Sequence, residues 1–171
     1  GGNLYGIEHG NERILRSPHP AKQTGQVLPY LVIGQTSLSC AACRLANSGG
    51  ISANTIAVAG GSTLFPAAVL FDSRDNLWFT DSGNNRVRKI LADGTITTIA
   101  GSGAPAYSGD GGPAIEAILD GPGGIAGDSR NTLAIAQSPK HRVSRADISG
   151  LLSTRARTGV SGRAGVAGGA S

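Results

Sequence analysis

Cysteine and histidine are the residue types in this chain that most readily bind metals or carry redox chemistry. The two cysteines form Cys40-Ala-Ala-Cys43, a spacing that suits half of a zinc site or a redox pair. A zinc site would need two more ligands, yet the sequence has no second motif of this kind, and His9, His19 and His141 show no ligand spacing. The βαβ context of a redox pair is also missing. We therefore predict a loop thiol pair or a local disulfide, and no metal or cofactor.

Motifs for phosphate binding and nucleophilic catalysis do not emerge from the sequence either. The glycines of Gly101-Ser-Gly103 are not followed by the Gly-Lys-Ser/Thr of a P-loop. No arrangement of serine, histidine and aspartate suggests a catalytic triad. These observations favour a protein that is not an enzyme.

Positive charge is concentrated toward the C-terminus. From residue 129 onward there are seven basic side chains and one acidic one, a net charge of +6, whereas the first 128 residues carry eight basic and ten acidic ones, a net charge of −2. A basic face could meet phosphate, but aromatic residues for base stacking are almost absent from this region. We therefore disfavour nucleic acid as a partner. No apolar run approaches the length of a membrane span.

The elements expected to position the residues named above are short apolar runs that are separated by turn-forming segments. Residues 76–81 contain the strand-favouring Trp-Phe-Thr run, and residues 81–85, Asp-Ser-Gly-Asn-Asn, are typical of a turn. Further strands are expected at 86–91 and 95–100, on either side of an Asp93-Gly94 hairpin signal. The pattern predicts an antiparallel meander of short strands.

This unit recurs later in the chain. A shift of 56 positions, from Asp72 to Asp128, aligns the sequence from Pro66 to the C-terminus without a gap. The matches fall on turns and strand interiors, where a structural repeat must agree. Because Asp72 and Asp128 recur at one position, we predict a structural turn role for both.

An earlier copy lies upstream. A shift of 73 positions aligns residues 3–16 with residues 76–89, and it places Arg13 at the repeat position that Arg86 and Arg142 occupy in the other two copies. A functional site is normally made once, so recurrence favours a structural role for these arginines. We predict that Asp81 and the recurrent arginine, Arg86 in the middle copy, form a charge-assisted pair that pins neighbouring strands or blades.

The repeated pattern resembles the NHL repeat. The resemblance rests on Asn-Leu-Trp at 76–78, Asp-Ser-Gly-Asn-Asn-Arg-Val-Arg-Lys at 81–89 and Asp-Gly-Thr-Ile-Thr-Thr-Ile-Ala-Gly at 93–101. The loop Tyr-Ser-Gly-Asp-Gly-Gly-Pro-Ala at 107–114 is most like that of large bacterial NHL-repeat proteins. NHL repeats imply a β-propeller, with one four-stranded blade per repeat around a central channel. The expected fold class is therefore all-β, a partial NHL-type β-propeller of about two to three four-stranded antiparallel blades with long glycine-rich loops.

The resemblance also assigns positions within a blade. From the innermost strand outward, the complete blade would comprise residues 67–72, 76–81, 86–91 and 95–100. Residues 123–128 would begin the next blade, and the loop 101–121 would connect the two. Within that loop, residues 113–119 suit about two helical turns, with Pro113 at the first helical position. The two innermost strands offer no His or Glu to the channel.

Three units are expected along the chain. Residues 1–65 would form an incomplete first blade with a loop insertion, residues 66–121 a complete blade with its linking loop, and residues 122–171 a degenerate, incomplete blade with a frayed C-terminal tail. Arg155 replaces an apolar strand residue, and burying its charge would be costly, so residues 153–171 are not expected to form a good strand. Propellers usually have about four to eight blades, so the chain is expected to be a fragment of a longer propeller.

The function implied by the resemblance is a non-enzymatic module that binds a protein or carbohydrate partner. Tyr107, Ser108 and Asp110 are the candidate partner-contacting residues, because they lie in the glycine-rich loop. Open blade edges could also support self-association. The alternative is a fragment of a propeller hydrolase or lyase whose catalytic residues lie outside this chain. The resemblance weakly favours an extracytoplasmic, bacterial setting.

Overall fold

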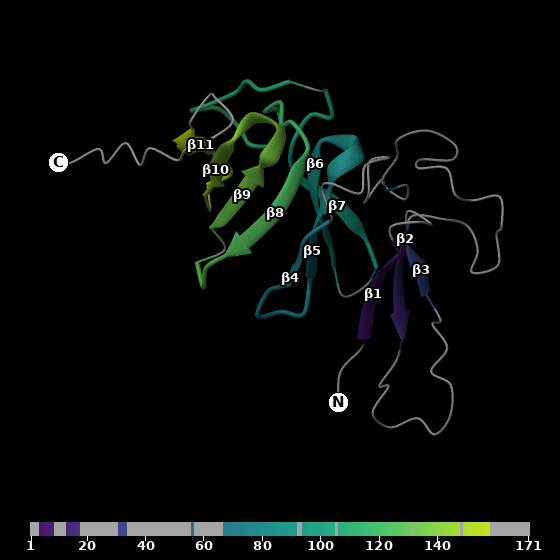
Figure 1. Cartoon of the computed structure of the whole chain (residues 1–171). Helices are drawn as coiled ribbons and strands as arrows, with labels where there is room; N and C mark the ends of the chain where they lie inside the picture. The colour runs from purple at the N-terminus through teal and green to yellow at the C-terminus, as the bar shows by residue number, and fades with distance from the viewer. Residues whose placement is uncertain are drawn as a thin grey trace.

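The protein is described by a computed structural model, in which residues 4–8, 13–17, 31–33, 56, 67–91, 94–104, 106–130, 132–147 and 149–157 are placed well enough to describe. These residues form eleven β-strands in three antiparallel sheets that follow one another in chain order (Figure 1). This confirms the predicted all-β fold class. Among the described residues, no helix has the length and hydrophobicity needed to cross a membrane.

The first sheet contains three described strands in the order β1-β2-β3. They are β1 (Leu4–Glu8), β2 (Arg13–Ser17) and β3 (Leu31–Ile33). The 73-residue repeat places β1 and β2 at the positions of the second and third strands of the next sheet. The cysteines, His9 and His19 lie outside the described residues, so the predictions made for them stay untested.

The second sheet is the complete four-stranded meander that the sequence predicts. Its strands, in spatial order, are β4 (Val69–Phe71), β5 (Leu77–Asp81), β6 (Arg86–Ile90) and β7 (Ile96–Ala100). The β6–β7 register shifts between Val87 and Arg88, an irregularity of the kind that a β-bulge produces.

The third sheet repeats this order. Its strands are β8 (Pro122–Gly127), β9 (Leu133–Gln137), β10 (Arg142–Ala146) and β11 (Leu152–Arg157). The expectation of an incomplete sheet without a strand after Ser153 is therefore wrong. Arg155 lies exposed on β11 at the sheet edge, so its charge is never buried and the predicted cost does not arise. The predicted frayed tail, residues 158–171, lies outside the described residues.

Aspartates shape three of the hairpin turns in the same way. Asp72 Oδ1 accepts the backbone amides two and four residues further on, at 2.9 and 3.0 Å. Asp128 does the same at 2.9 and 2.8 Å, and Asp147 at 2.9 and 3.0 Å. A short side chain that accepts turn amides in this way fixes the loop without help from the rest of the fold.

Buried apolar side chains join the sheets in pairs. Ile14 and Ile33 of the first sheet pack with Leu77, Phe79 and Ile90 of the second. A second cluster joins the second and third sheets, and its members include Trp78, Val87, Leu133, Ile135 and Leu152. The buried apolar residues of β5 and β6 thus divide between the two clusters, so that some pack against the first sheet and others against the third. This is expected for sheets stacked face to face.

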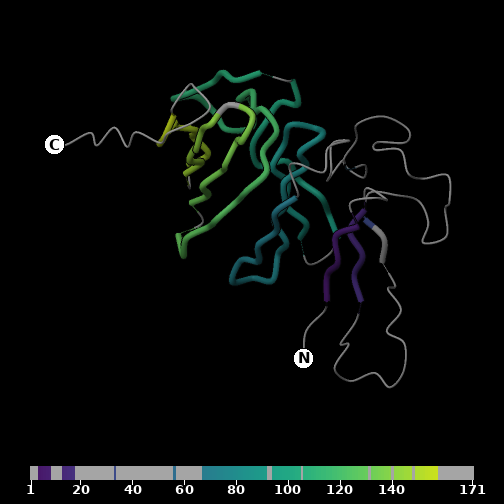
Figure 2. The backbone as a smooth tube through the Cα atoms, in the orientation of Figure 1, coloured from purple at the N-terminus to yellow at the C-terminus, as the bar shows by residue number. Residues whose placement is uncertain are grey.

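The segment 101–121 crosses from the second sheet to the third (Figure 2). Residues 113–119 do not form the predicted two helical turns. The amides of Glu116 and Ala117 both donate to the Pro113 carbonyl at 3.1 Å, which makes one turn. A second turn cannot follow, because the amide of Ile118 donates to Ser108 and the carbonyl of Ala117 accepts from Ser102. These hydrogen bonds to other parts of the loop use the amide and carbonyl groups that a second helical turn would need.

Candidate functional site: a cleft between the second and third sheets

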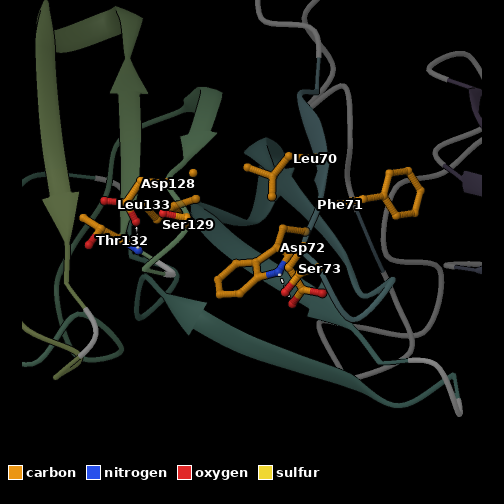
Figure 3. A pocket seen from close by; sticks show the side chains of 10 residues that line it. Leu70, Phe71, Asp72, Ser73, Asp128, Ser129, Thr132 and Leu133 are labelled. Carbon is orange, nitrogen blue, oxygen red and sulfur yellow. Dashed lines mark hydrogen bonds between the residues drawn. The ribbon is translucent and has the colours of Figure 1, made fainter.

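A cavity of about 320 Å³ lies between two equivalent hairpin turns of neighbouring sheets. The second sheet contributes Leu70, Phe71, Asp72, Ser73 and Trp78, and the third contributes Gly127, Asp128, Ser129, Thr132 and Leu133. Figure 3 shows the two Asp-Ser pairs on opposite sides. This volume is at the lower end of the range typical of small-molecule sites, about 300–1,000 Å³. We call this cavity the inter-sheet cleft.

On the second-sheet side, the carboxylate of Asp72 is fully engaged. Its Oδ2 accepts hydrogen bonds from Asn76 Nδ2 at 2.9 Å and Trp78 Nε1 at 3.0 Å, and it lies 3.2 Å from Lys89 Nζ. Burial raises the pKa of Asp72, but the hydrogen bonds from Asn76, Trp78 and the turn amides outweigh it and hold the pKa well below its ordinary value. Asp72 therefore orients Trp78 and is a poor candidate for proton transfer.

Lys89 completes this arrangement. Its Nζ lies 4.6 Å from the centroid of the Trp78 ring, within cation–π range, while it pairs with Asp72. The first sheet has the same pairing at the equivalent repeat positions, where Arg16 Cζ lies 5.9 Å from the centroid of the Tyr5 ring. Sequence reasoning missed both pairs, although an aromatic residue and a cation at matching positions of two repeats was a signal that could have found them.

The third-sheet side differs at the same repeat positions. Asp128 is exposed. Its Oδ1 accepts the turn amides described above, and the side chain of Thr132 also hydrogen-bonds to its carboxylate. The amide of Thr132 and, more weakly, the charge of Arg130 hold its pKa below the ordinary value, so Asp128 is ionised at neutral pH. Trp78 is replaced here by Ala134, which has no side-chain donor, and Lys89 by Arg145, whose Nη2 lies 3.5 Å from Thr132 Oγ1.

The recurrent arginines have three different partners, which corrects the predicted pairing. Asp81 is paired with Arg88, at 3.1 Å. Arg86 instead donates to the carbonyl of Ser102 at 2.7 Å.

In the other two copies the recurrent arginine contacts a nearby side chain. Arg13 pairs with Glu8 across β1 and β2, and Arg142 stacks its guanidinium on the Tyr107 ring, with Cζ 3.2 Å from the ring centroid. One repeat position therefore serves three local contacts rather than a shared site.

The candidate partner-contacting loop is attached to the third sheet. Tyr107 Oη lies 2.6 Å from Thr154 Oγ1 and donates to Asp110 Oδ1 at 3.3 Å. Asp110 also accepts the backbone amide of Thr154, and Ser108 pairs through its backbone with Ile118. These contacts anchor the loop beside β11. Partner binding by these residues stays a prediction.

No metal-binding group emerges from the residues that the structure describes, which contain no cluster of three or more His, Cys, Asp or Glu suited to hold an ion. His141 is exposed and follows the short 3₁₀ turn Ser138–Lys140, where it adopts a left-handed conformation with φ of 46°. Its counterpart in the second sheet, Asn85, has φ of 52°. The left-handed conformation of His141 is thus that of the residue that ends this type of turn in both sheets.

Comparisons with known proteins place the fold. No family model matches the chain, and no curated protein matches it. Among solved structures, the chain is similar to a structural-genomics protein of unknown function from Bacteroides thetaiotaomicron, with a TM-score of 0.64 and 19% identity over 93% of this chain and 34% of that one. It also matches a streptogramin B lyase (TM-score 0.49, 14% identity, 90% of this chain and 36% of that one). Virginiamycin B lyase from Staphylococcus aureus matches at a TM-score of 0.48 and 13% identity, over 90% of this chain and 37% of that one.

The chain is a partial β-propeller. The structural neighbours are β-propeller proteins, and the successive four-stranded antiparallel sheets correspond to blades of that fold. The chain spans about a third of the length of the solved structures that it matches. At this level of identity the likeness concerns the fold alone.

Proposed function

We propose that this chain is a segment of an NHL-type β-propeller that acts as a non-enzymatic module for binding a protein partner. The blades would correspond to residues 1–65, 66–121 and 122–171. The observation that carries the proposal is the inter-sheet cleft, which joins an apolar floor to polar groups from two neighbouring blades. Loops and clefts between rigid sheets are where propellers and similar scaffolds commonly carry function.

The chemistry of the cleft favours binding over catalysis. A general acid needs a pKa near the working pH, whereas both cleft aspartates have lowered pKa values and stay ionised. Asp72 is further committed to Asn76, Trp78 and Lys89. What the cleft offers is shape, apolar surface and one accessible charge at Asp128.

A peptide-display selection against the full chain tests this proposal. We expect enriched peptides to bind the unmodified chain and to lose binding in Gly127→Val, which projects a larger side chain into the cleft. A β-carbon at residue 127 would make ordinary contacts, 3.6 Å from Leu70, so the strand tolerates the change. Gly6→Val is the matched control, because Gly6 lies in β1 outside the cleft and its added β-carbon meets nothing within 4 Å.

Two outcomes would contradict the proposal. The first is that no peptide is enriched, and the second is that enriched peptides bind Gly127→Val as well as they bind the unmodified chain. A glycan array probed with the same three proteins separates a carbohydrate partner from a protein partner, because only the former would give cleft-dependent binding to glycans.

A further inference from the structure

The second sheet contains an internal example of how this fold binds a cation. Lys89 lies against the Trp78 ring and places its ammonium group 3.2 Å from Asp72 Oδ2. The side chain combines an aliphatic stem on an apolar surface with a charged end at a carboxylate, which is how lysine and arginine are commonly buried in part. The arrangement is satisfied within the sheet.

The third sheet keeps the aspartate and loses the groups that satisfy it. Asp128 occupies the repeat position of Asp72, but Ala134 replaces the indole, and Arg145 is directed to Thr132 instead of the carboxylate. The turn amides of Asp128 both donate to Oδ1, and the side chain of Thr132 supplies one further hydrogen bond to the carboxylate. The carboxylate of Asp128 therefore has neither the indole donor nor the ammonium partner that Asp72 has.

The cleft places this carboxylate beside apolar surface. Leu70, Trp78 and Leu133 all line the same 320 Å³ cavity as Asp128. Trp78 also lines a second cavity that contains Lys89, whereas Lys89 does not line the cleft. An incoming side chain can thus contact Trp78 within the cleft without displacing Lys89.

From this arrangement we infer that the inter-sheet cleft binds a lysine or arginine side chain of a peptide, with the aliphatic stem on Leu70, Trp78 and Leu133 and the cationic end on the carboxylate of Asp128. The inference rests on the proposed protein-binding function and names the chemistry of the partner. A carbohydrate fits less well, because its many hydroxyl groups each need a partner, and the acceptors of Asp72 and the donor of Trp78 are already used.

The positive charge of Arg130 partly offsets the negative charge of the Asp128 carboxylate at this site. Arg130 lies on the same turn as Asp128, and its charge already contributes to the low pKa of that carboxyl group. Its guanidinium therefore competes with an incoming cation. Removing this charge should strengthen cation binding, whereas removing Asp128 should weaken it.

The fluorescence of Trp78, the single tryptophan of the chain, provides a direct measurement. We would titrate the full chain with acetyl-Gly-Lys-Gly-amide, with the uncharged norleucine analogue and with a neutral glucose oligosaccharide. The expected result is saturable binding of the lysine peptide, weaker at high salt, and about tenfold tighter than that of the norleucine peptide. Asp128→Asn should remove this preference and Arg130→Gln should increase it.

Asp147→Asn is the matched control, because Asp147 forms the same type of turn but does not line the cleft. Equal binding of the two peptides would overturn the inference while leaving a protein-binding cleft in place. Binding of the oligosaccharide alone, or of no probe, would overturn it together with the proposed function. The comparison of lysine with norleucine uses the unmodified chain, so the test holds even if a variant fails to fold.

Discussion

Arg88 Nη1 lies 3.1 Å from Asp81 Oδ2, and both side chains are buried, with exposed fractions of 3% and 0%. Asn84 Nδ2 also donates to both carboxylate oxygens, at 2.9 and 3.0 Å. At the equivalent positions of the third sheet, 56 residues on, Gln137 Nε2 donates to Ser144 Oγ at 2.9 Å, and both of these side chains are fully buried. One buried position in the repeat thus holds an ion pair in one sheet and a neutral hydrogen bond in the next.

The contribution of the ion pair to stability can be tested by replacing Asp81 and Arg88 with the residues found at the equivalent positions of the third sheet. Arg88→Ser leaves the carboxylate of Asp81 buried without its cation, and breaking a buried pair in this way costs about 3–5 kcal/mol. The double variant Asp81→Gln with Arg88→Ser copies the neutral pair of the third sheet and removes the same arginine side chain. We therefore expect the double variant to be more stable than the single one in urea unfolding followed by circular dichroism. Equal stability of the two would show that lost packing, not the unpaired charge, dominates.

Stability should depend on pH through Asp72. Because its pKa in the folded chain is below its unfolded value, the unfolded state binds more protons in the acidic range. The stabilisation is therefore fully present above the unfolded pKa of about 3.9 and is lost as the pH falls below it. Asp128 and Asp147 act in the same direction. Urea midpoints measured between neutral and acid pH should fall, and Asp72→Asn should flatten the curve more than Asp147→Asn, since only Asp72 has a buried set of side-chain donors. A curve for Asp72→Asn that matches the unmodified chain would contradict the assigned role.

Gly101 and Gly94 have similar φ angles, so alanine substitutions at the two positions can distinguish the cost of a left-handed conformation from the cost of a steric clash. Gly101 has φ of 96°, and a β-carbon there would lie 2.2 Å from the carbonyl oxygen of Asn85. Gly94 has φ of 90°, but its added β-carbon would meet nothing within 4 Å. Gly94→Ala should therefore cost only the left-handed conformation, about 1–2 kcal/mol, whereas Gly101→Ala should cost clearly more because backbone must move. Thermal unfolding of both variants measures the difference, and similar losses would mean that the close approach to Asn85 is relieved cheaply.

Arg86 should hold the start of the linking loop. Its guanidinium donates to Ser102 and packs against Gly103, where an added β-carbon would lie 2.5 Å from Arg86 Cζ. Arg86→Met keeps much of the stem but removes the hydrogen bond, so we expect a loss of about 1 kcal/mol and faster hydrogen exchange at the Ser102 amide, which donates to Ala117 at 2.7 Å. Arg145→Met, on another sheet, is the control and should leave that amide unchanged. Unaltered exchange at Ser102 in Arg86→Met would exclude the tethering role.

The sequence by itself determined the meander and its repeat. Aspartate side chains that accept turn amides and short apolar strands act over a few residues, so the strands of the second sheet and the turn roles of Asp72 and Asp128 could be predicted from local chemistry. The same reasoning was wrong for residues 113–119 and for Arg155. Those outcomes depend on hydrogen bonds from distant segments and on which strand lies at the sheet edge.

Only the tertiary structure decided which charged groups meet and where a cleft forms. Strand order and register bring Arg88, rather than Arg86, to Asp81, although both arginines are close to it in sequence. The cleft exists because two neighbouring sheets bring Trp78 and Asp128, fifty positions apart, to opposite walls of one cavity. Periodicity can indicate that two residues occupy equivalent places in a repeat, but the distance between their side chains is set by how the sheets pack.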